Sequence, residues 1–247
     1  LPTTRHSRSL SRLNNLLFPS TPANVPPPVT YDQNWAGAVV IGVGYRSVSG
    51  TLSVPPIRLP AGANKEVVHA VSAWVGIDGE AACPNAIMQA GVDMYMNHSI
   101  PWYWAWFEWY PNRSTYLRDF VIHPGDSLTF NVTATALNAA LFSITNHRTG
   151  QTDSMALTEK GPLLCGLSAE WIVEDFWGTD GVPLADFGRI GFSEATWATD
   201  TGVTGGVEAA RMRGVKEAAG GRAAIECGKE GEEKDEVGCY YQAGGES

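Results

Sequence analysis

The sequence predicts an all-β protein in which many short antiparallel strands form a sandwich or a closed barrel. Apolar and polar residues alternate with period two through most of the chain, as in "SLTFNVTATA" at residues 127–136. Turn-forming pairs such as Asp78-Gly79 and Pro124-Gly125 separate these runs. No helical pattern of useful length precedes about residue 202. Short strands with turns at this spacing are typical of sandwiches and barrels.

The composition divides the chain into three parts. Residues 1–30 hold six prolines, three arginines and no acidic residue, which indicates a basic, Pro-rich leader or a propeptide remnant. Residues 31–205 carry all nine tryptophans, and we expect them to form the folded domain. Residues 206–247 are rich in Gly, Ala and alternating charges, so we expect a tail that is disordered or weakly helical.

Two runs in the central part have one wholly apolar face each. Successive side chains of a strand point to opposite faces, so odd and even positions can be sorted separately. The runs are "VSAWVGID" at residues 71–78 and "AIMQAGVDMY" at residues 86–95. The apolar sets, which we expect in the core, are Val71, Ala73, Val75, Ile77, Ala86, Met88, Ala90, Val92 and Met94.

The opposite faces of these and two further runs combine acids, one amide and large aromatic rings. An ordinary solvated strand face carries Lys, Thr, Ser and Glu rather than several tryptophans. If the four strands share a sheet, they predict an aromatic-walled groove with carboxylates and an amide at its floor. The alternative is a second apolar layer under a loop. The residues concerned are Trp74, Asp78, Gln89, Asp93, Trp102, Trp104, Trp106, Glu108, Tyr110, Glu170, Glu174 and Phe176.

Cysteine content and three sequons favour a secreted protein. The formal net charge is −9, which disfavours nucleic acid as a partner, and no apolar stretch approaches the roughly 18 residues of a membrane span. Four cysteines permit two disulfides, and their spacing fits no zinc pattern. No signal peptide is visible at Leu1, so we expect an extracellular protein whose signal peptide is missing from this chain. Three sequons predict glycosylation at Asn97, Asn112 and Asn131.

Several kinds of catalytic site are disfavoured. There is no G-x-S-x-G elbow, and five scattered histidines offer no convincing partner for a nucleophilic serine. The tripeptide Asp200-Thr201-Gly202 matches the aspartic peptidase motif, but such enzymes need two of these motifs or a homodimer. We interpret this single match as chance. We expect neither a metal nor a cofactor.

Six sequence blocks, in order, resemble one family. They are "NWAGAVV", "AWVGIDG", "AIMQAGVD", "WFEWYP", "HPGDSLTF" and "AEWIVEDF", within residues 33–198. Together they closely resemble the glutamic peptidases, or eqolisins, which are secreted acid endopeptidases. The resemblance implies a sandwich of two antiparallel sheets, of the concanavalin-like or jelly-roll type, with irregular extensions at both ends. It also implies a polypeptide substrate, and we expect a monomer.

The resemblance also implies roles for individual residues. Gln89 and Glu174 match the family's catalytic pair, whereas Glu170 is the earlier glutamate of its block and is expected to be structural. A disulfide is implied between Cys83 and Cys165. The pairing of the other two cysteines stays open. Positions that line the family's site are matched by Trp74, Asp78, Asp93, Glu108 and Tyr110.

The mechanism implied by the resemblance is compatible with acid. An ionised Glu174 would take a proton from water, and the Gln89 amide would donate a hydrogen bond to the oxyanion. Neither group depends on a neutral imidazole.

Two other readings of the groove remain open. A sandwich-fold glycosidase would use two carboxylates such as Glu108 and Glu174, with tryptophans as platforms for sugar rings. A lectin-like module or an inactive homologue would bind without turnover. The family continues into further strands after "FSEAT", where this chain turns to Gly, Ala and charges. That difference bears on whether the chain is active.

Overall fold

The computed structural model describes residues 29–80, 82–176, 181–216, 223–232 and 235–243. Within these ranges the regular structure consists of sixteen strands, so the predicted all-β class is confirmed. None of the described segments forms a helix long and apolar enough to cross a membrane. The expected leader falls almost wholly on residues 1–28, outside the described part, and β1 (Thr30–Asp32) follows it.

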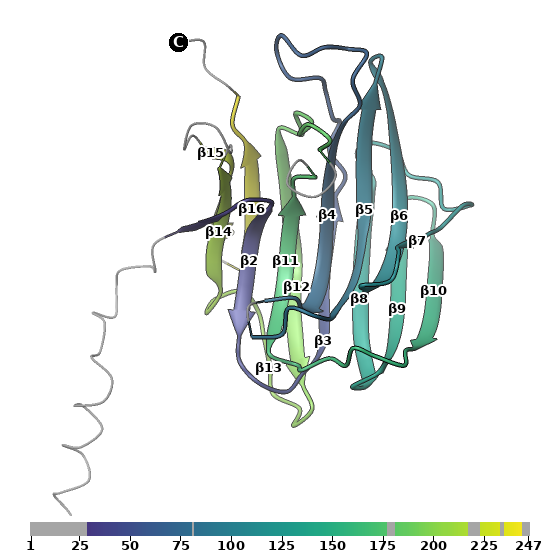
Figure 1. Cartoon of the computed structure of the whole chain (residues 1–247), viewed down its shortest axis with the longest axis vertical. Coiled ribbons are helices and arrows are strands. Elements are labelled where there is room, and N and C mark those ends of the chain that lie inside the picture. The colour runs from purple at the N-terminus through teal and green to yellow at the C-terminus, as the bar shows by residue number, and fades with distance from the viewer. Residues whose placement is uncertain (1–28, 81, 177–180, 217–222, 233–234, 244–247) are drawn as a thin grey trace, which may run out of the picture.

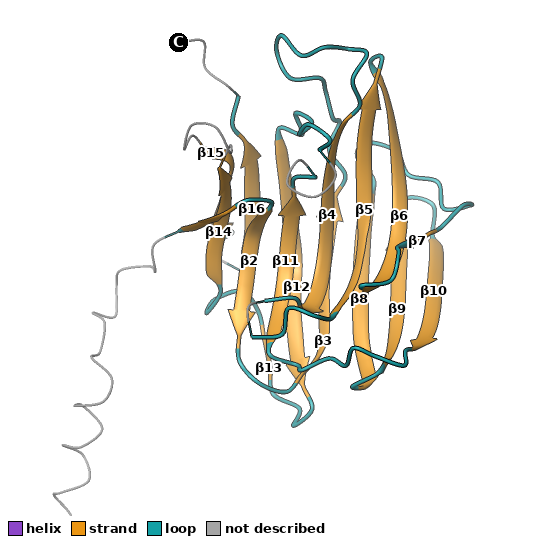
Figure 2. Ribbon diagram, in the orientation of Figure 1, coloured by secondary structure: helices purple, strands orange, loops and turns teal. Residues whose placement is uncertain are grey.

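The strands form a sandwich, which confirms the sandwich over the closed barrel (Figure 1). One sheet lies in front of the other in that view, and the colouring of Figure 2 shows that both layers consist of strands joined by loops. In spatial order the front sheet contains β2 (Trp35–Ile41), β11 (Ser168–Glu174), β4 (His69–Asp78), β5 (Ile87–Asn97), β6 (Ile100–Tyr110) and β7 (Thr115–Tyr116).

The back sheet is also antiparallel, and a short strand lies off its main path. In spatial order it contains β10 (Gln151–Thr158), β9 (Ala139–Asn146), β8 (Ser127–Ala136), β3 (Tyr45–Ser53) and β12 (Arg189–Thr199), with β13 (Thr204–Gly205) paired to β12.

Three C-terminal strands join the two sheets along one side. They are β14 (Arg211–Lys216), β15 (Ala223–Glu230) and β16 (Glu236–Tyr241). β14 pairs with β2 of the front sheet, β16 pairs with β12 of the back sheet, and β15 lies between them. The first strand, β1, pairs in parallel with β14. The hydrogen-bonded path therefore continues from one sheet into the other.

The expected domain end near residue 205, followed by a disordered or weakly helical tail, is wrong. Met212, Val215, Ile225 and Val237 from the last three strands lie in the main core. These strands are short and interrupted by glycine, and their outward positions carry charges. The alternation of apolar and polar residues was therefore not recognised in the sequence. Cys227 and Cys239 stand opposite each other and form a disulfide.

The core fills the space between the sheets. The core contains all nine apolar residues that were predicted from the runs at 71–78 and 86–95. The prediction from alternation is therefore confirmed for these two strands. These nine residues pack against inward residues of the back sheet such as Leu128, Phe130 and Val132. Because inward and outward positions alternate, the same strands turn their polar and aromatic residues to the outer face of the front sheet.

Candidate active site

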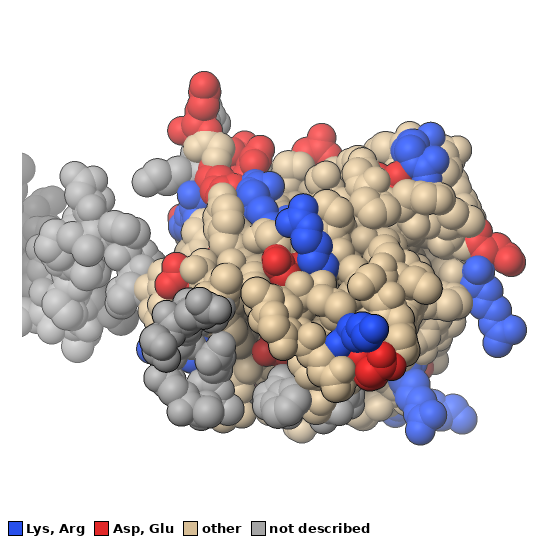
Figure 3. Space-filling model, turned by 90° about the horizontal axis from the view of Figure 1, so that it is seen from above, with Lys and Arg blue, Asp and Glu red and all other residues tan. Residues whose placement is uncertain are grey.

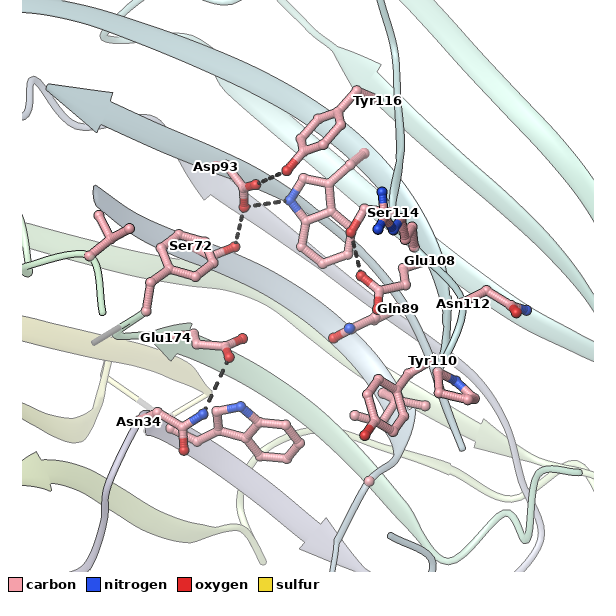
Figure 4. Close-up of a pocket in the computed structure, with 18 of the residues that line it drawn as sticks. Asn34, Ser72, Gln89, Asp93, Glu108, Tyr110, Asn112, Ser114, Tyr116 and Glu174 are labelled. Atoms are coloured by element: carbon pink, nitrogen blue, oxygen red, sulfur yellow. Dashed lines mark hydrogen bonds between the residues drawn. The ribbon is translucent and has the colours of Figure 1, made fainter. Parts of the chain in front are cut away.

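A groove of about 750 Å³ opens on the outer face of the front sheet (Figure 4). It is lined by side chains of β4, β5, β6, β7 and β11 and of the loop before β2. The predicted groove therefore exists. Among the predicted site residues, the structure places Gln89, Asp93, Glu108, Tyr110 and Glu174 in its lining.

Strand register brings Gln89 and Glu174 to the same groove. β4 lies between β11 and β5, and Ser72 stands opposite both Glu174 and Asp93. Gln89 stands opposite Gly76, four residues further along β4 on the same face. Parity puts all these residues on one side of the sheet, and pairing sets their spacing.

The Glu174 carboxyl is partly buried and receives N–H groups on both oxygens. Trp74 donates from Nε1 to Oε2 at 2.8 Å, and Asn34 donates from Nδ2 to Oε1 at 3.4 Å. Burial raises the pKa of Glu174 to about 7; hydrogen bonds from Trp74 and Trp35 work against this rise, and the charge of Asp93 adds to it. Glu174 is therefore a proton acceptor and donor that titrates near neutrality.

Trp74 lies beneath the groove rather than in its wall. Its indole is fully buried and packs with Val39, Trp106 and Ile172 in a small second cluster. A Cβ added to Gly91, directly opposite Trp74, would lie 2.6 Å from the Trp74 Cβ and 2.6 Å from the Ala73 carbonyl oxygen, so this position requires glycine. Trp74 supports Glu174 from below, where we expected it to line the site.

Gln89 is almost fully buried, at 6% exposure, and presents one unused atom. Glu108 stands opposite it on β6, and the Gln89 side chain opposes the rise in the pKa of that carboxyl group. The Gln89 Oε1 atom has no hydrogen-bond partner within the described part of the chain. A buried acceptor in this state is costly unless water or a ligand supplies a donor. The amide is therefore prepared to receive an N–H or O–H from the groove.

Two further carboxyls of the groove are held by hydroxyl groups. Glu108 accepts a hydrogen bond from Ser114; burial raises the pKa of Glu108, and the bonds from Ser114 and Gln89 oppose that rise. Burial likewise raises the pKa of Asp93, against hydrogen bonds from four donors. The donors to Asp93 are Ser72, Tyr95, Trp106 and Tyr116.

Stacked aromatic rings close one end of the groove. Tyr95 stacks on Phe176 with ring centroids 6.2 Å apart, and on Trp102 with centroids 5.5 Å apart. At the other end Tyr110 is exposed and lines the opening. The groove thus has apolar walls around a polar floor, which suits a polypeptide that places side chains on both sides of one backbone bond.

Asp78 does not line the groove, which corrects the expectation drawn from the family. It is fully buried, and its carboxylate accepts backbone N–H groups of Cys165, Gly166 and Leu167 at 2.7–2.9 Å. Its φ of 68° takes the last residue of β4 out of strand geometry, so parity fails there. Asp78 anchors the loop that leads into β11.

The implied disulfide joins Cys83 to Cys165, next to that loop. It therefore reinforces the Asp78 contact that fixes the approach to β11 and Glu174. Among the described residues, one group of three potential metal ligands has been found, namely Asp78, Cys83 and Cys165. The disulfide and the three N–H contacts already occupy these atoms.

Glu170 lies outside the groove, in the structural position expected for it. Its side chain is fully buried and accepts a hydrogen bond from Ser168 at 2.7 Å. Burial raises its pKa well above the ordinary value, and the neighbouring charge of Glu80 adds to the rise. The salt bridge from Arg213 to Glu80, at 2.6 Å, ties this region to β14.

Seen from above, the surface of the described residues carries both signs of charge, interspersed rather than gathered (Figure 3). The three sequon asparagines lie in different surroundings. Asn112 is exposed at the rim of the groove, whereas Asn97 and Asn131 are partly buried.

Sequence reasoning missed the groove contacts of Asn34, Ser114 and Tyr116. Asn34 precedes β2, and the other two belong to the segment after β6 that folds back over the sheet. Alternation could not locate them, because each lies outside or at the end of a regular run. The available signal was that Asn34 begins the "NWAGAVV" block and that Ser114 and Tyr116 closely follow the "WFEWYP" block.

Two curated peptidases resemble this chain in sequence. Aspergillopepsin-2 from Aspergillus niger is 37% identical over 205 residues, which cover 76% of this chain and 71% of that protein. Scytalidopepsin B from Scytalidium lignicola is 37% identical over 178 residues, which cover 71% of this chain and 65% of that protein.

Solved structures of glutamic peptidases have the same fold. Scytalido-glutamic peptidase, crystallised with a transition state analog inhibitor, has a TM-score of 0.74 and 33% identity, over 86% of this chain and all of that chain. Aspergilloglutamic peptidase from Aspergillus niger has a TM-score of 0.64 and 36% identity, over 70% of this chain and 99% of that chain.

The family model extends through the C-terminal strands. It matches residues 33–241, so β14, β15 and β16 fall within the matched region and are no departure from the family. The resemblance seen in the six sequence blocks is thereby confirmed. With the fold, the groove and these matches in agreement, the chain belongs to the Peptidase A4 family.

Proposed function

We propose that this chain is an acid endopeptidase in which Gln89 and Glu174 act together on one peptide bond. Membership of a peptidase family makes the chain a peptidase. The observation that supports the dyad is the pairing, in one groove, of a carboxyl with a pKa near neutrality and a buried amide with an unused oxygen.

The proposed reaction begins with water bound between the two side chains. Ionised Glu174 takes a proton from this water, whose oxygen bonds to the scissile carbonyl carbon while the carbonyl electrons move to its oxygen. The Gln89 amide donates a hydrogen bond to the resulting oxyanion, and its Oε1 accepts from the attacking water. Glu174 then returns the proton to the leaving nitrogen as the carbon–nitrogen bond breaks.

The raised pKa of Glu174 makes a specific demand on this scheme. With a pKa of about 7, the free carboxyl is largely protonated in acid, whereas a general base must be ionised. The proposal therefore requires that the bound substrate and its water lower this pKa.

The pH dependence of kcat tests the base role. A base in the enzyme–substrate complex gives an ascending acid limb whose midpoint lies below 7. A rate that stays constant down to the lowest pH at which the protein is folded would contradict it, and would assign Glu174 the role of general acid in the first step.

Activity on defined substrates tests the function itself. The purified protein, incubated at acid pH with denatured protein and separately with polysaccharide, should release peptides and no sugars. Sugar release would favour the glycosidase reading, and no turnover would favour the binding-module reading. Glu174→Gln and Gln89→Ala should each lower kcat/KM by about a thousandfold or more, because both residues act on the same transition state.

Glu170→Gln is the matched control. It makes the same substitution four residues earlier on β11, and glutamine resembles the protonated form that burial favours at Glu170. This variant should keep most of the activity in acid. Near-normal turnover in Glu174→Gln would disprove the assignment.

We further propose that the protein is a secreted, N-glycosylated monomer. The disulfides Cys83–Cys165 and Cys227–Cys239 support an oxidising compartment, and Asn97, Asn112 and Asn131 supply the acceptor sequons. Intact mass of the secreted protein before and after glycosidase treatment tests modification. An unchanged mass would exclude it.

A further inference from the structure

The segment at residues 111–116, here called the strap, folds back over the outer face of β6. It ends in β7, which pairs Thr115 with Phe107 and Tyr116 with Trp106. This pairing holds the strap against the groove, and Ser114 lies beside Glu108 (Figure 4).

Glu108 links the strap to the Gln89 amide. The Ser114 hydroxyl donates to Glu108 Oε2. The Gln89 side chain faces the same carboxyl group and opposes the rise in the pKa of Glu108, as a hydrogen-bond donor does. Glu108 and Gln89 are direct cross-strand neighbours, so no other side chain stands between them.

This contact decides which end of the amide faces the groove. An amide has two donor N–H groups and one acceptor oxygen. With its donor end toward Glu108, the amide has its Oε1 left without a partner among the described residues. A flipped amide would turn its oxygen toward Glu108, where two acceptors repel each other when that carboxyl group is ionised.

We propose that Ser114 is a positioning residue: its hydroxyl fixes the Glu108 carboxylate, and Glu108 fixes the orientation of the Gln89 amide toward the scissile bond. The inference rests on the proposed role of Gln89. Ser114 acts through Glu108, to which its hydroxyl donates. Its effect is therefore expected in kcat rather than in KM, because misorientation of the amide weakens the transition state more than substrate binding.

Three variants test the proposal, all made in a host without N-glycosylation, since Ser114 is also part of a sequon. Ser114→Ala should lower kcat about tenfold and leave KM within about twofold, which corresponds to the loss of one hydrogen bond to a charged group. Ser114→Thr keeps the hydroxyl and should restore most of kcat. Ser193→Ala removes a hydroxyl that donates to the Thr51 carbonyl on the back sheet, and should leave kcat unchanged.

Glu174→Gln, measured in parallel, separates this inference from the proposed function. If Glu174→Gln is inactive while Ser114→Ala keeps wild-type kcat, the dyad stands and the positioning role is overturned. An equal loss in Ser114→Ala and Ser114→Thr would overturn it too, because the hydroxyl would then not be the cause. A loss of kcat in Ser114→Ala that follows a matching fall in melting temperature would identify a structural role only.

Discussion

The two sheets of the sandwich share one core but differ on their outer faces. The back sheet presents threonine pairs such as Thr51–Thr129, with hydroxyl oxygens 2.7 Å apart, and Thr145–Thr152, 2.9 Å apart. The front sheet presents Asp93, which is buried and receives hydrogen bonds from indole and hydroxyl groups.

The difference shows what an outer strand face needs in order to hold a site. Short hydroxyl residues are stable beside water and satisfy one another across strands. Carboxyl groups that are partly removed from water need several donors each, and tryptophan supplies an N–H together with a large apolar surface. The outer face of the front sheet supplies both hydrogen-bond donors and apolar side chains around its carboxyl groups. It can therefore hold carboxyl groups whose pKa is raised by burial.

The largest expected effect concerns the strands that join the sheets. Truncation after residue 205 removes β14–β16, including core residues Met212, Ile225 and Val237. It leaves β2 and β12 with unpaired edges, and we expect loss of the cooperative fold. Thermal unfolding followed by circular dichroism measures this. A truncated chain that unfolds cooperatively at the wild-type temperature would show that each sheet is stable without the joining strands.

The two disulfides allow a second comparison of the two regions. One crosslinks the segments beside the groove, and the other crosslinks two of the strands that join the sheets. Cys83–Cys165 spans 82 residues and Cys227–Cys239 spans 12. In the chain-entropy model their removal costs about 4.5 and about 3 kcal/mol respectively. Double Cys→Ala variants of each pair, compared by urea unfolding, should rank in that order. The reverse order would show that native contacts, rather than loop length, set the effect.

The titration of Glu174 gives the front sheet a pH-dependent stability. Its pKa rises from 4.5 to about 7 on folding, so between these values the folded state keeps a proton that the unfolded state loses. Stability therefore falls as pH rises from 4.5 to 7, on the order of 2 kcal/mol for this group. Urea unfolding should show Glu174→Gln with a smaller loss over this range. Identical pH dependence in both proteins would contradict it.

The smallest effects compare one hydroxyl on each sheet. Tyr116→Phe removes a donor 2.7 Å from buried Asp93 and should cost about 1.5 kcal/mol of stability at neutral pH. Thr129→Val alters the solvated back face and should stay within about 0.5 kcal/mol. Equal costs would show that the two outer faces do not differ as described.

Much of the groove could be predicted from parity. Alternation separates Met88 and Ala90 from Gln89 without knowledge of pairing, because side-chain direction in a strand follows from backbone geometry alone. The residues at the ends of runs were less predictable. Asp78 leaves the face on which parity put it, because its positive φ breaks the alternation.

The sequence by itself determined the fold class, the inward residues of the central strands and the side of the sheet on which Gln89, Glu108 and Glu174 lie. These follow from local periodicity and from six ordered blocks. Only the tertiary structure decided that the last three strands close the sandwich, that Trp74 lies under Glu174, and that Ser114 reaches Glu108. Such contacts depend on which strands pair and in what register, and that choice is made by packing between segments far apart in the chain.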